Sequence, residues 1–142
     1  MTSSSQFVDF DLNSVASEKR FKGFGVYVIR AVTNEGKPIS IKRLGGVDPD
    51  GILYIGRSGF ESRSPSRTIG NRLGEFLRGQ HSGGKTYERA RGILNANKEF
   101  SGHSLQARAL NCEEAKIAET EKRLLKKYFE QFAELPPTYS SR

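Results

Sequence analysis

The chain has 142 residues, enough for one domain with its own hydrophobic core. An apolar fraction of 35% with 10% aromatic residues argues against a disordered chain, and no apolar run is long enough to span a bilayer. The N-terminus lacks the apolar stretch of a signal peptide, and a single cysteine, Cys112, fits a reducing compartment. We therefore expect a cytoplasmic protein with no membrane partner.

The chain divides into three parts by composition. Residues 1–20 are a polar lead-in with a short helix predicted near Asn13 to Lys19, residues 21–139 form the domain, and residues 140–142 are a tail. The first β-branched, apolar run, Phe24 to Ala31, predicts a strand. After it, turn residues fill the stretch from Asn34 to Gly51, in which the alternating segment Pro38 to Arg43 favours a small additional strand.

The second predicted strand runs from Ile52 to Arg57, and the two strands carry related tripeptides, Gly25-Val26-Tyr27 and Tyr54-Ile55-Gly56. Side chains alternate along a strand, so each tyrosine shares a face with its glycine. In one antiparallel register Tyr27 lies opposite Tyr54 and Gly25 opposite Gly56, which sets two phenols over bare backbone. The alternative is a pair of ordinary core strands, and the tripeptides alone do not decide between them.

The rest of the chain predicts three helices and a third strand. A Ser/Arg/Pro loop, Ser58 to Arg67, precedes a helix from Thr68 to Arg78 with an apolar stripe. Ser82-Gly83-Gly84 is expected to end the helical structure before a second helix, which covers roughly Thr86 to Asn97. The third strand spans Ser104 to Leu110. The apolar stripe of the first of these helices consists of Ile69, Leu73, Phe76 and Leu77.

The last helix is predicted from Asn111 as N-cap, with Glu114 completing a capping box, to about Phe132, before Leu135-Pro136-Pro137. The element order predicts a small α/β/α sandwich with a three-stranded, largely antiparallel sheet.

The positive charge of the chain is concentrated in one window. Lys and Arg number 23 against 16 acids, for a net charge of +7, and residues 57–92 hold eight cations against three glutamates. Seven of the eight are arginines, whose planar fork suits phosphate oxygens, so a polyphosphate partner is favoured over a solvated basic surface. The cations are Arg57, Arg63, Arg67, Arg72, Arg78, Lys85, Arg89 and Arg91.

A carboxylate stands in the apolar stripe of the last helix. At 100° per residue, Glu121 lies at the centre of an arc whose other members are apolar or aromatic. A buried carboxylate needs a cation, a metal or hydrogen bonds, so the alternatives are a structural salt bridge to an arginine and a metal ligand. One acid suits Mg²⁺, which keeps several waters. The other members are Ile117, Ala118, Leu124, Leu125, Tyr128 and Phe132.

Taken together, these features resemble the GIY-YIG nuclease superfamily, and the resemblance covers roughly Phe21 to Tyr139. It rests on four elements in order: Gly-Val-Tyr, Tyr-Ile-Gly-Arg, the arginine of Asn71-Arg72-Leu73 and the glutamate of the last helix. The long gap between the two tripeptides and the terminal Leu-Pro-Pro are most similar to the stand-alone restriction-endonuclease branch.

The resemblance implies a compact α/β/α domain that hydrolyses phosphodiesters with one divalent metal, Mg²⁺ or Mn²⁺. By position, Tyr27 would act beside the attacking water as the general base or its helper, and Tyr54 would orient the water or the phosphate. Arg57 and Arg72 would contact the phosphate, and Glu121 would bind the metal. Nearby positive charge is expected to favour the Tyr27 phenolate.

We therefore predict a DNA endonuclease, most readily on double-stranded DNA. The nucleic-acid backbone would be held by Arg63, Arg67, Arg78, Lys85, Arg89 and Arg91. Cutting both strands favours a homodimer or two sequential nicks.

The chain departs from the family pattern twice. Phe76 stands where many relatives have histidine or tyrosine, and Thr138-Tyr139 where many have asparagine. A catalytically weak nucleic-acid-binding module and a structure-specific repair nuclease therefore remain alternatives.

Overall fold

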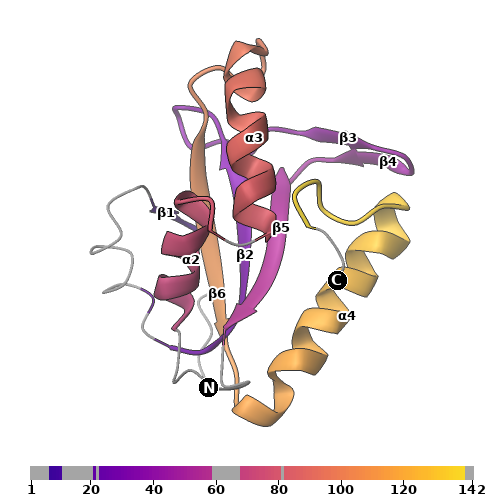
Figure 1. The fold of residues 1–142 in the computed structure, drawn as a ribbon. Helices are drawn as coiled ribbons and strands as arrows, with labels where there is room; N and C mark the ends of the chain where they lie inside the picture. The colour runs from indigo at the N-terminus through magenta and orange to yellow at the C-terminus, as the bar shows by residue number, and fades with distance from the viewer. Residues whose placement is uncertain (1–6, 11–20, 22, 59–67, 81, 140–142) are drawn as a thin grey trace.

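The computed structural model describes residues 7–10, 21, 23–58, 68–80 and 82–139. Its main sheet has the strand order β1-β6-β2-β5, and every neighbouring pair is antiparallel (Figure 1). The three predicted strands are present as β2 (Gly25–Val32), β5 (Ile52–Ser58) and β6 (Ser104–Asn111). The prediction of three strands was incomplete, because β1 (Val8–Phe10) adds a fourth beside β6, inside the segment expected to be a polar lead-in.

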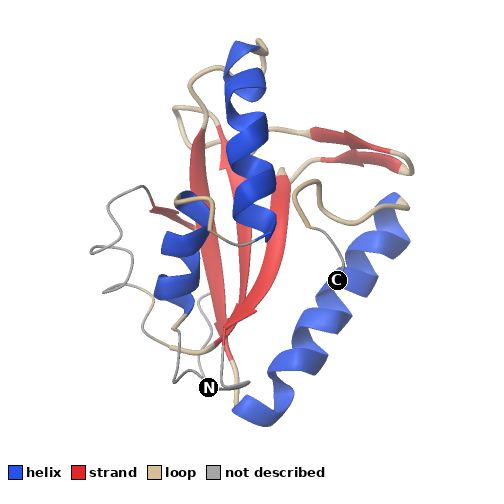
Figure 2. Cartoon of the chain, in the orientation of Figure 1, coloured by secondary structure: helices blue, strands red, loops and turns tan. Residues whose placement is uncertain are grey.

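Helices cover both faces of this sheet, as the predicted α/β/α sandwich requires (Figure 2). α2 (Ile69–Leu77) and α3 (Ser82–Ala96) lie on one face, and α4 (Glu114–Phe132) lies on the other. The alternation of β2 explains the division, because Tyr27 and Ile29 pack in the α2 and α3 core while Val26 and Val28 pack in the α4 core. No helix among the described residues is both long and apolar enough to cross a membrane.

The helix ends differ in part from the predictions. The helix expected from Thr68 begins one residue later, because Thr68 is the N-cap of α2, in a capping box with Asn71; the whole predicted apolar stripe of α2 is buried. In contrast, α3 begins at Ser82, so the Gly83-Gly84 pair lies in the first turn of this helix and does not separate two helices. The predicted cap of α4 was also wrong: Asn111 ends β6 opposite Gly25, and Glu113 takes the cap position without a side-chain hydrogen bond.

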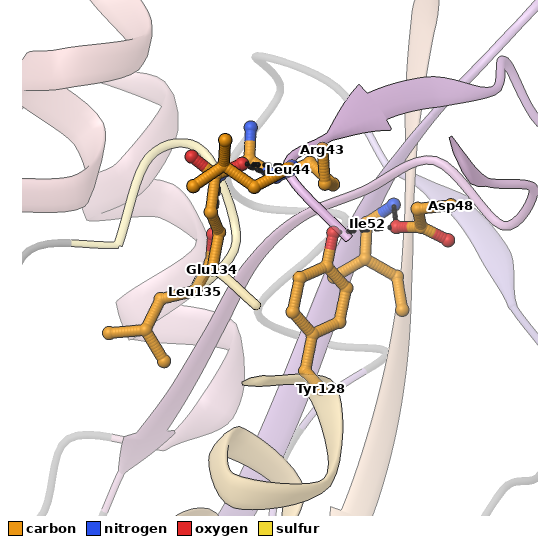
Figure 3. Close-up of polar contacts among 7 residues, drawn as sticks. All are labelled: Arg43, Leu44, Asp48, Ile52, Tyr128, Glu134 and Leu135. Carbon is orange, nitrogen blue, oxygen red and sulfur yellow. Dashed lines mark hydrogen bonds and ion pairs between the residues drawn. The ribbon is translucent and has the colours of Figure 1, made fainter. Parts of the chain in front are cut away.

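The long connection between β2 and β5 forms a separate hairpin, β3 (Ile41–Arg43) with β4 (Gly46–Asp48). β3 falls within the small strand expected in Pro38 to Arg43. The Asp48 carboxylate is fully buried and accepts hydrogen bonds from the Tyr128 hydroxyl (2.9 Å) and the Ile52 backbone amide (Figure 3). It also accepts a hydrogen bond from the Asp50 backbone amide. These bonds join the hairpin to α4.

The hairpin has a second attachment, at the end of α4. Arg43 donates to the Leu135 carbonyl (2.7 Å) and pairs with Glu134, whose carboxylate also accepts from the Leu44 amide (Figure 3).

The predicted helix near residues 13–19 lies outside the described residues, as do Arg63 and Arg67.

Candidate active site

The two motif tyrosines lie side by side, but not in the expected register. Tyr27 is opposite Gly56, and Tyr54 is opposite Ile29, so the strands are offset by two residues from the pairing that sets Tyr27 against Tyr54. Gly25 likewise faces Ser58, not Gly56. The tyrosine rings are diagonal neighbours with centroids 6.0 Å apart.

Gly56 is the bare backbone between the two phenols. A Cβ atom at this position would lie 2.6 Å from the Tyr27 hydroxyl oxygen and 2.6 Å from Cε2 of Tyr54, closer than real side chains approach. Only glycine therefore allows both rings to occupy these places. The expected bare backbone beneath the two phenols is therefore supplied by Gly56 alone, and not by Gly25 and Gly56 facing each other.

The Tyr27 hydroxyl is fully buried, and the Arg72 guanidinium of α2 interacts with it. Burial and the neighbouring Tyr54 raise the pKa of Tyr27 well above its usual value, Arg72 opposes them, and Glu121 adds to the rise. Arg72 lowers the pKa of Tyr27, as expected of nearby positive charge, but in the protein alone desolvation outweighs this effect. At neutral pH this residue is a protonated phenol.

Arg72 projects from α2 toward the same phenols. Its Nη1 lies 2.6 Å from the Glu75 carboxylate one turn later, which leaves other guanidinium donors for a ligand. Burial lowers the pKa of Arg72, but interactions with Tyr27, Glu75 and Tyr54 outweigh burial and raise it. The side chain is 23% exposed, so this positive charge reaches from the core to solvent.

Glu121 is buried on the inner side of α4, as the helical arc predicted, with 7% of the residue exposed. Ala118, placed on the same arc, is exposed instead. Oε1 of Glu121 lies 3.6 Å from Nε of Arg57, whose side chain is 34% exposed. The salt bridge considered from the sequence is therefore present, and its arginine side opens to solvent.

The four motif elements approach one another across β5. Arg57 and Glu121 belong to the α4 side, whereas Tyr27, Tyr54 and Arg72 belong to the α2 and α3 side. β5 is the edge strand of the described sheet, and Glu121 raises the pKa of Tyr27 from the other side of it. A centre with phenols, guanidinium donors and one carboxylate can bind and polarise a phosphate group.

Two further neighbours of Tyr54 were not predicted as site residues. A side chain at Gly83 would overlap Cε1 of Tyr54, so the first turn of α3 packs on this ring through glycine. Tyr139 packs on it from the C-terminal segment, with ring centroids 5.9 Å apart. In the sequence, Gly83 has the signature of a helix breaker, and nothing local ties Tyr139 to the site.

Four cations of the predicted nucleic-acid set gather at one place. Arg78 at the end of α2 and Lys85, Arg89 and Arg91 on α3 line a hollow of about 520 Å³, together with Leu77, Gly79 and Glu88. Arg91 is paired with Glu88 (3.1 Å), and the other three cations are exposed. The hollow therefore carries a net positive charge.

No protein-family model matches the chain, and no curated protein or solved structure matches it. The resemblance to GIY-YIG nucleases therefore rests on the motif residues of the sequence. Among the described residues, no group of three or more histidine, cysteine or acidic side chains could hold a metal ion. A metal at this centre would depend on Glu121 with water.

Proposed function

We propose that this protein is a cytoplasmic, metal-dependent DNA endonuclease of the GIY-YIG type, with the stand-alone restriction branch as its nearest functional class. One observation carries the proposal. The buried phenol of Tyr27 on β2 lies against the bare backbone of Gly56 and beside the Tyr54 ring, and it interacts with Arg72 of α2 and Glu121 of α4.

Each residue has a role that fits phosphodiester hydrolysis. Negative charge develops on the phosphate oxygens during the reaction, and the Arg72 guanidinium can stabilise it electrostatically. Tyr27, as a neutral phenol, can donate a hydrogen bond to the phosphate or hold the attacking water. It can serve as general base only where added positive charge lowers its pKa.

The donor set fits one divalent ion of the Mg²⁺ type. Mg²⁺ takes one or two protein carboxylates and keeps several waters, and Glu121 is one buried carboxylate whose charge acts on the Tyr27 phenol. When bound, Mg²⁺ or Mn²⁺ would supply charge that stabilises the transition state. Glu121 would hold the ion, and Arg57, whose Nε lies 3.6 Å from Glu121, would contact the phosphate.

The basic hollow is the proposed backbone contact. Arg78, Lys85 and Arg89 would bind phosphates of double-stranded DNA without reading its sequence. Arg63 and Arg67 are proposed for the same role from the sequence. A single centre per chain cuts both strands as a homodimer or in two nicks.

The Arg57–Glu121 contact and the complete burial of Tyr27 favour a second candidate function, a nucleic-acid-binding module with little catalysis. In such a module Glu121 only holds Arg57, and no water reaches Tyr27. The two functions differ in what the loss of the carboxylate does. A nuclease loses cleavage, whereas a binding module keeps nearly all of its affinity.

The test is to incubate the protein with supercoiled plasmid and Mg²⁺, with EDTA as control, and to measure DNA binding in parallel. For a nuclease, Glu121→Gln and Arg72→Ala each reduce the cleavage rate, by about 10² or more. Glu119→Gln is the matched control, because this acid lies on the same helix and its side chain is 71% exposed.

Tyr27→Phe completes the test, since it removes only the hydroxyl. Wild-type cleavage in this variant would show that the phenol has no part in the reaction. Absence of Mg²⁺-dependent cleavage by the wild type, together with DNA affinity that Arg72→Ala weakens and Glu121→Gln does not, would establish the binding module instead.

A further inference from the structure

Two arginines lie next to each other on the face of the sheet opposite the tyrosines. Arg30 on β2 pairs with Gln106, and Arg108 on β6 pairs with Val28, so the two arginines are diagonal neighbours on adjacent strands. This is the face on which Val26 and Val28 pack under α4, and α4 packs chiefly on β5 and β2. Arg30 and Arg108 therefore lie on the same face of the sheet as Val26 and Val28, toward β6.

Both guanidinium groups lie over the ring of Phe7. The Cζ atom of Arg30 lies 3.9 Å from the centroid of the Phe7 ring, and that of Arg108 lies 5.4 Å from it. A cation over an aromatic face is attracted by the ring, so Phe7 holds two like charges in one place. Their orientation is set before any ligand arrives.

The hydrogen bonding of this pair is incomplete. Nε and Nη2 of Arg30 both donate to Oε1 of Gln106, at 3.0 and 2.8 Å, which fixes one edge of that guanidinium on a neutral amide. Nε of Arg108 is buried and has no hydrogen-bond partner among the described residues. A buried donor without an acceptor is costly, so this position favours an incoming oxygen.

The pair also brings two like charges close together. Among the side chains that the structure describes, no carboxylate forms an ion pair with Arg30 or Arg108. Burial lowers the pKa of Arg30, Asp50 raises it from a distance, and Arg108 lowers it as a like charge would. Mutual repulsion between adjacent cations is relieved when an anion binds between them.

We propose that Arg30 and Arg108, seated on Phe7, form a binding site for a phosphate group on the second face of the sheet. The guanidinium fork matches phosphate oxygens in geometry, and both side chains are already oriented. The ligand is either a free phosphate compound or the backbone of a nucleic acid. The inference does not depend on nuclease activity, since it uses none of the residues assigned to cleavage.

The first test uses inorganic phosphate as the probe, with sodium chloride at matched ionic strength as reference. Phosphate is expected to raise the melting temperature of the wild type above the chloride reference and to shift the NMR signal of an arginine Nε–Hε group. Arg30→Gln and Arg108→Gln are each expected to weaken phosphate binding at least ten-fold. Arg123→Gln should bind like the wild type, because its side chain is 68% exposed on α4.

A wild type that responds equally to phosphate and chloride would overturn the proposal. So would variants at 30 and 108 that retain the full phosphate response. If Arg108→Gln fails to fold, the wild-type Nε–Hε titration and Arg30→Gln still decide the question.

A second arm identifies the source of the phosphate. Binding of a short DNA duplex is measured against salt concentration, where each lost phosphate contact lowers the slope by about one. A lower slope and affinity in both arginine variants assign the site to a nucleic-acid backbone. Unchanged duplex binding, with the inorganic phosphate response lost, assigns it to a free phosphate compound. Failure of plasmid cleavage alone would leave both results intact.

Discussion

Gly56 on β5 lies directly opposite Tyr27 on β2, and each residue limits which side chains the other position can hold. The phenol covers the glycine, and the glycine leaves the space that the hydroxyl fills. This dependence is invisible in either tripeptide alone, since a glycine within a strand has several meanings. It becomes specific only when the register is known.

Gly56→Ala is expected to destabilise the protein by about 1–3 kcal/mol, because the new methyl group would lie where the Tyr27 hydroxyl and the Tyr54 ring now are. Chemical denaturation measures the change. Gly92→Ala is the control: it lies in α3 with no atom within 4 Å of the new Cβ, and should stabilise by roughly 0.5–1 kcal/mol. Equal effects of the two substitutions would refute the close approach at Gly56.

At the scale of elements, the strands were the most predictable part of the fold. β2, β5 and β6 follow β-branched, alternating runs, which have few other ways to bury their apolar side chains. Helix starts were less predictable. The Gly83-Gly84 pair has low helix propensity, but contact with Tyr54 and with the Phe76 backbone outweighs that cost. Asn111 could cap a helix, yet pairing with Gly25 places it in β6.

The hairpin of β3 and β4 depends on a side chain from α4. Tyr128→Phe removes a side-chain donor to the buried Asp48 carboxylate, and is expected to cost about 1–3 kcal/mol of unfolding free energy. Hydrogen exchange at the Asp50 and Ile52 amides, which bind the same carboxylate, should quicken. Tyr139→Phe is the control for loss of a phenol. Unchanged exchange in Tyr128→Phe would mean that the two amide bonds hold the hairpin without the tyrosine.

The C-terminal segment is held against β5 at Leu53. The amide and the hydroxyl of Thr138 both donate to the Leu53 carbonyl, at 3.0 and 2.7 Å, and the next residue packs on Tyr54. Thr138→Val keeps the shape and removes one donor, so a loss of about 1 kcal/mol is expected from denaturation curves. Thr138→Ser retains the hydroxyl and should lose less; the reverse order would contradict the assignment.

Across the whole molecule, the location of the site residues was more predictable than their chemical state. The inward position of Glu121 follows from helical periodicity within α4. Its pairing with Arg57 and the neutral state of Tyr27 do not, because they depend on burial and on groups brought together by four elements. No local pattern reports the dielectric environment of a side chain.

Stability in alkaline solution follows from the same burial. Desolvation raises the pKa of Tyr87 to about 12, with a smaller opposing effect of Arg91. Above about pH 10 an unfolded tyrosine loses its proton while folded Tyr87 keeps it, so the unfolding free energy falls as pH rises toward 12. One such proton contributes a slope of up to about 1.4 kcal/mol per pH unit.

Urea unfolding at pH 9, 10 and 11 measures this slope, and Tyr87→Phe should make it shallower. The comparison uses the pH dependence and not the absolute stability, since the substitution also removes the 2.6 Å contact with His103. An unchanged slope would show that this tyrosine does not titrate differently in the two states.

The rings around Tyr54 have a spectroscopic consequence. The chain has five tyrosines and no tryptophan, and four of the five belong to one row of contacting rings: Tyr27 and Tyr139 adjoin Tyr54, and Phe76 links Tyr54 to Tyr87. Near-ultraviolet dichroism and intrinsic emission therefore originate mainly beside the candidate centre. Optical titration of the unlabelled protein can follow events there without a reporter group.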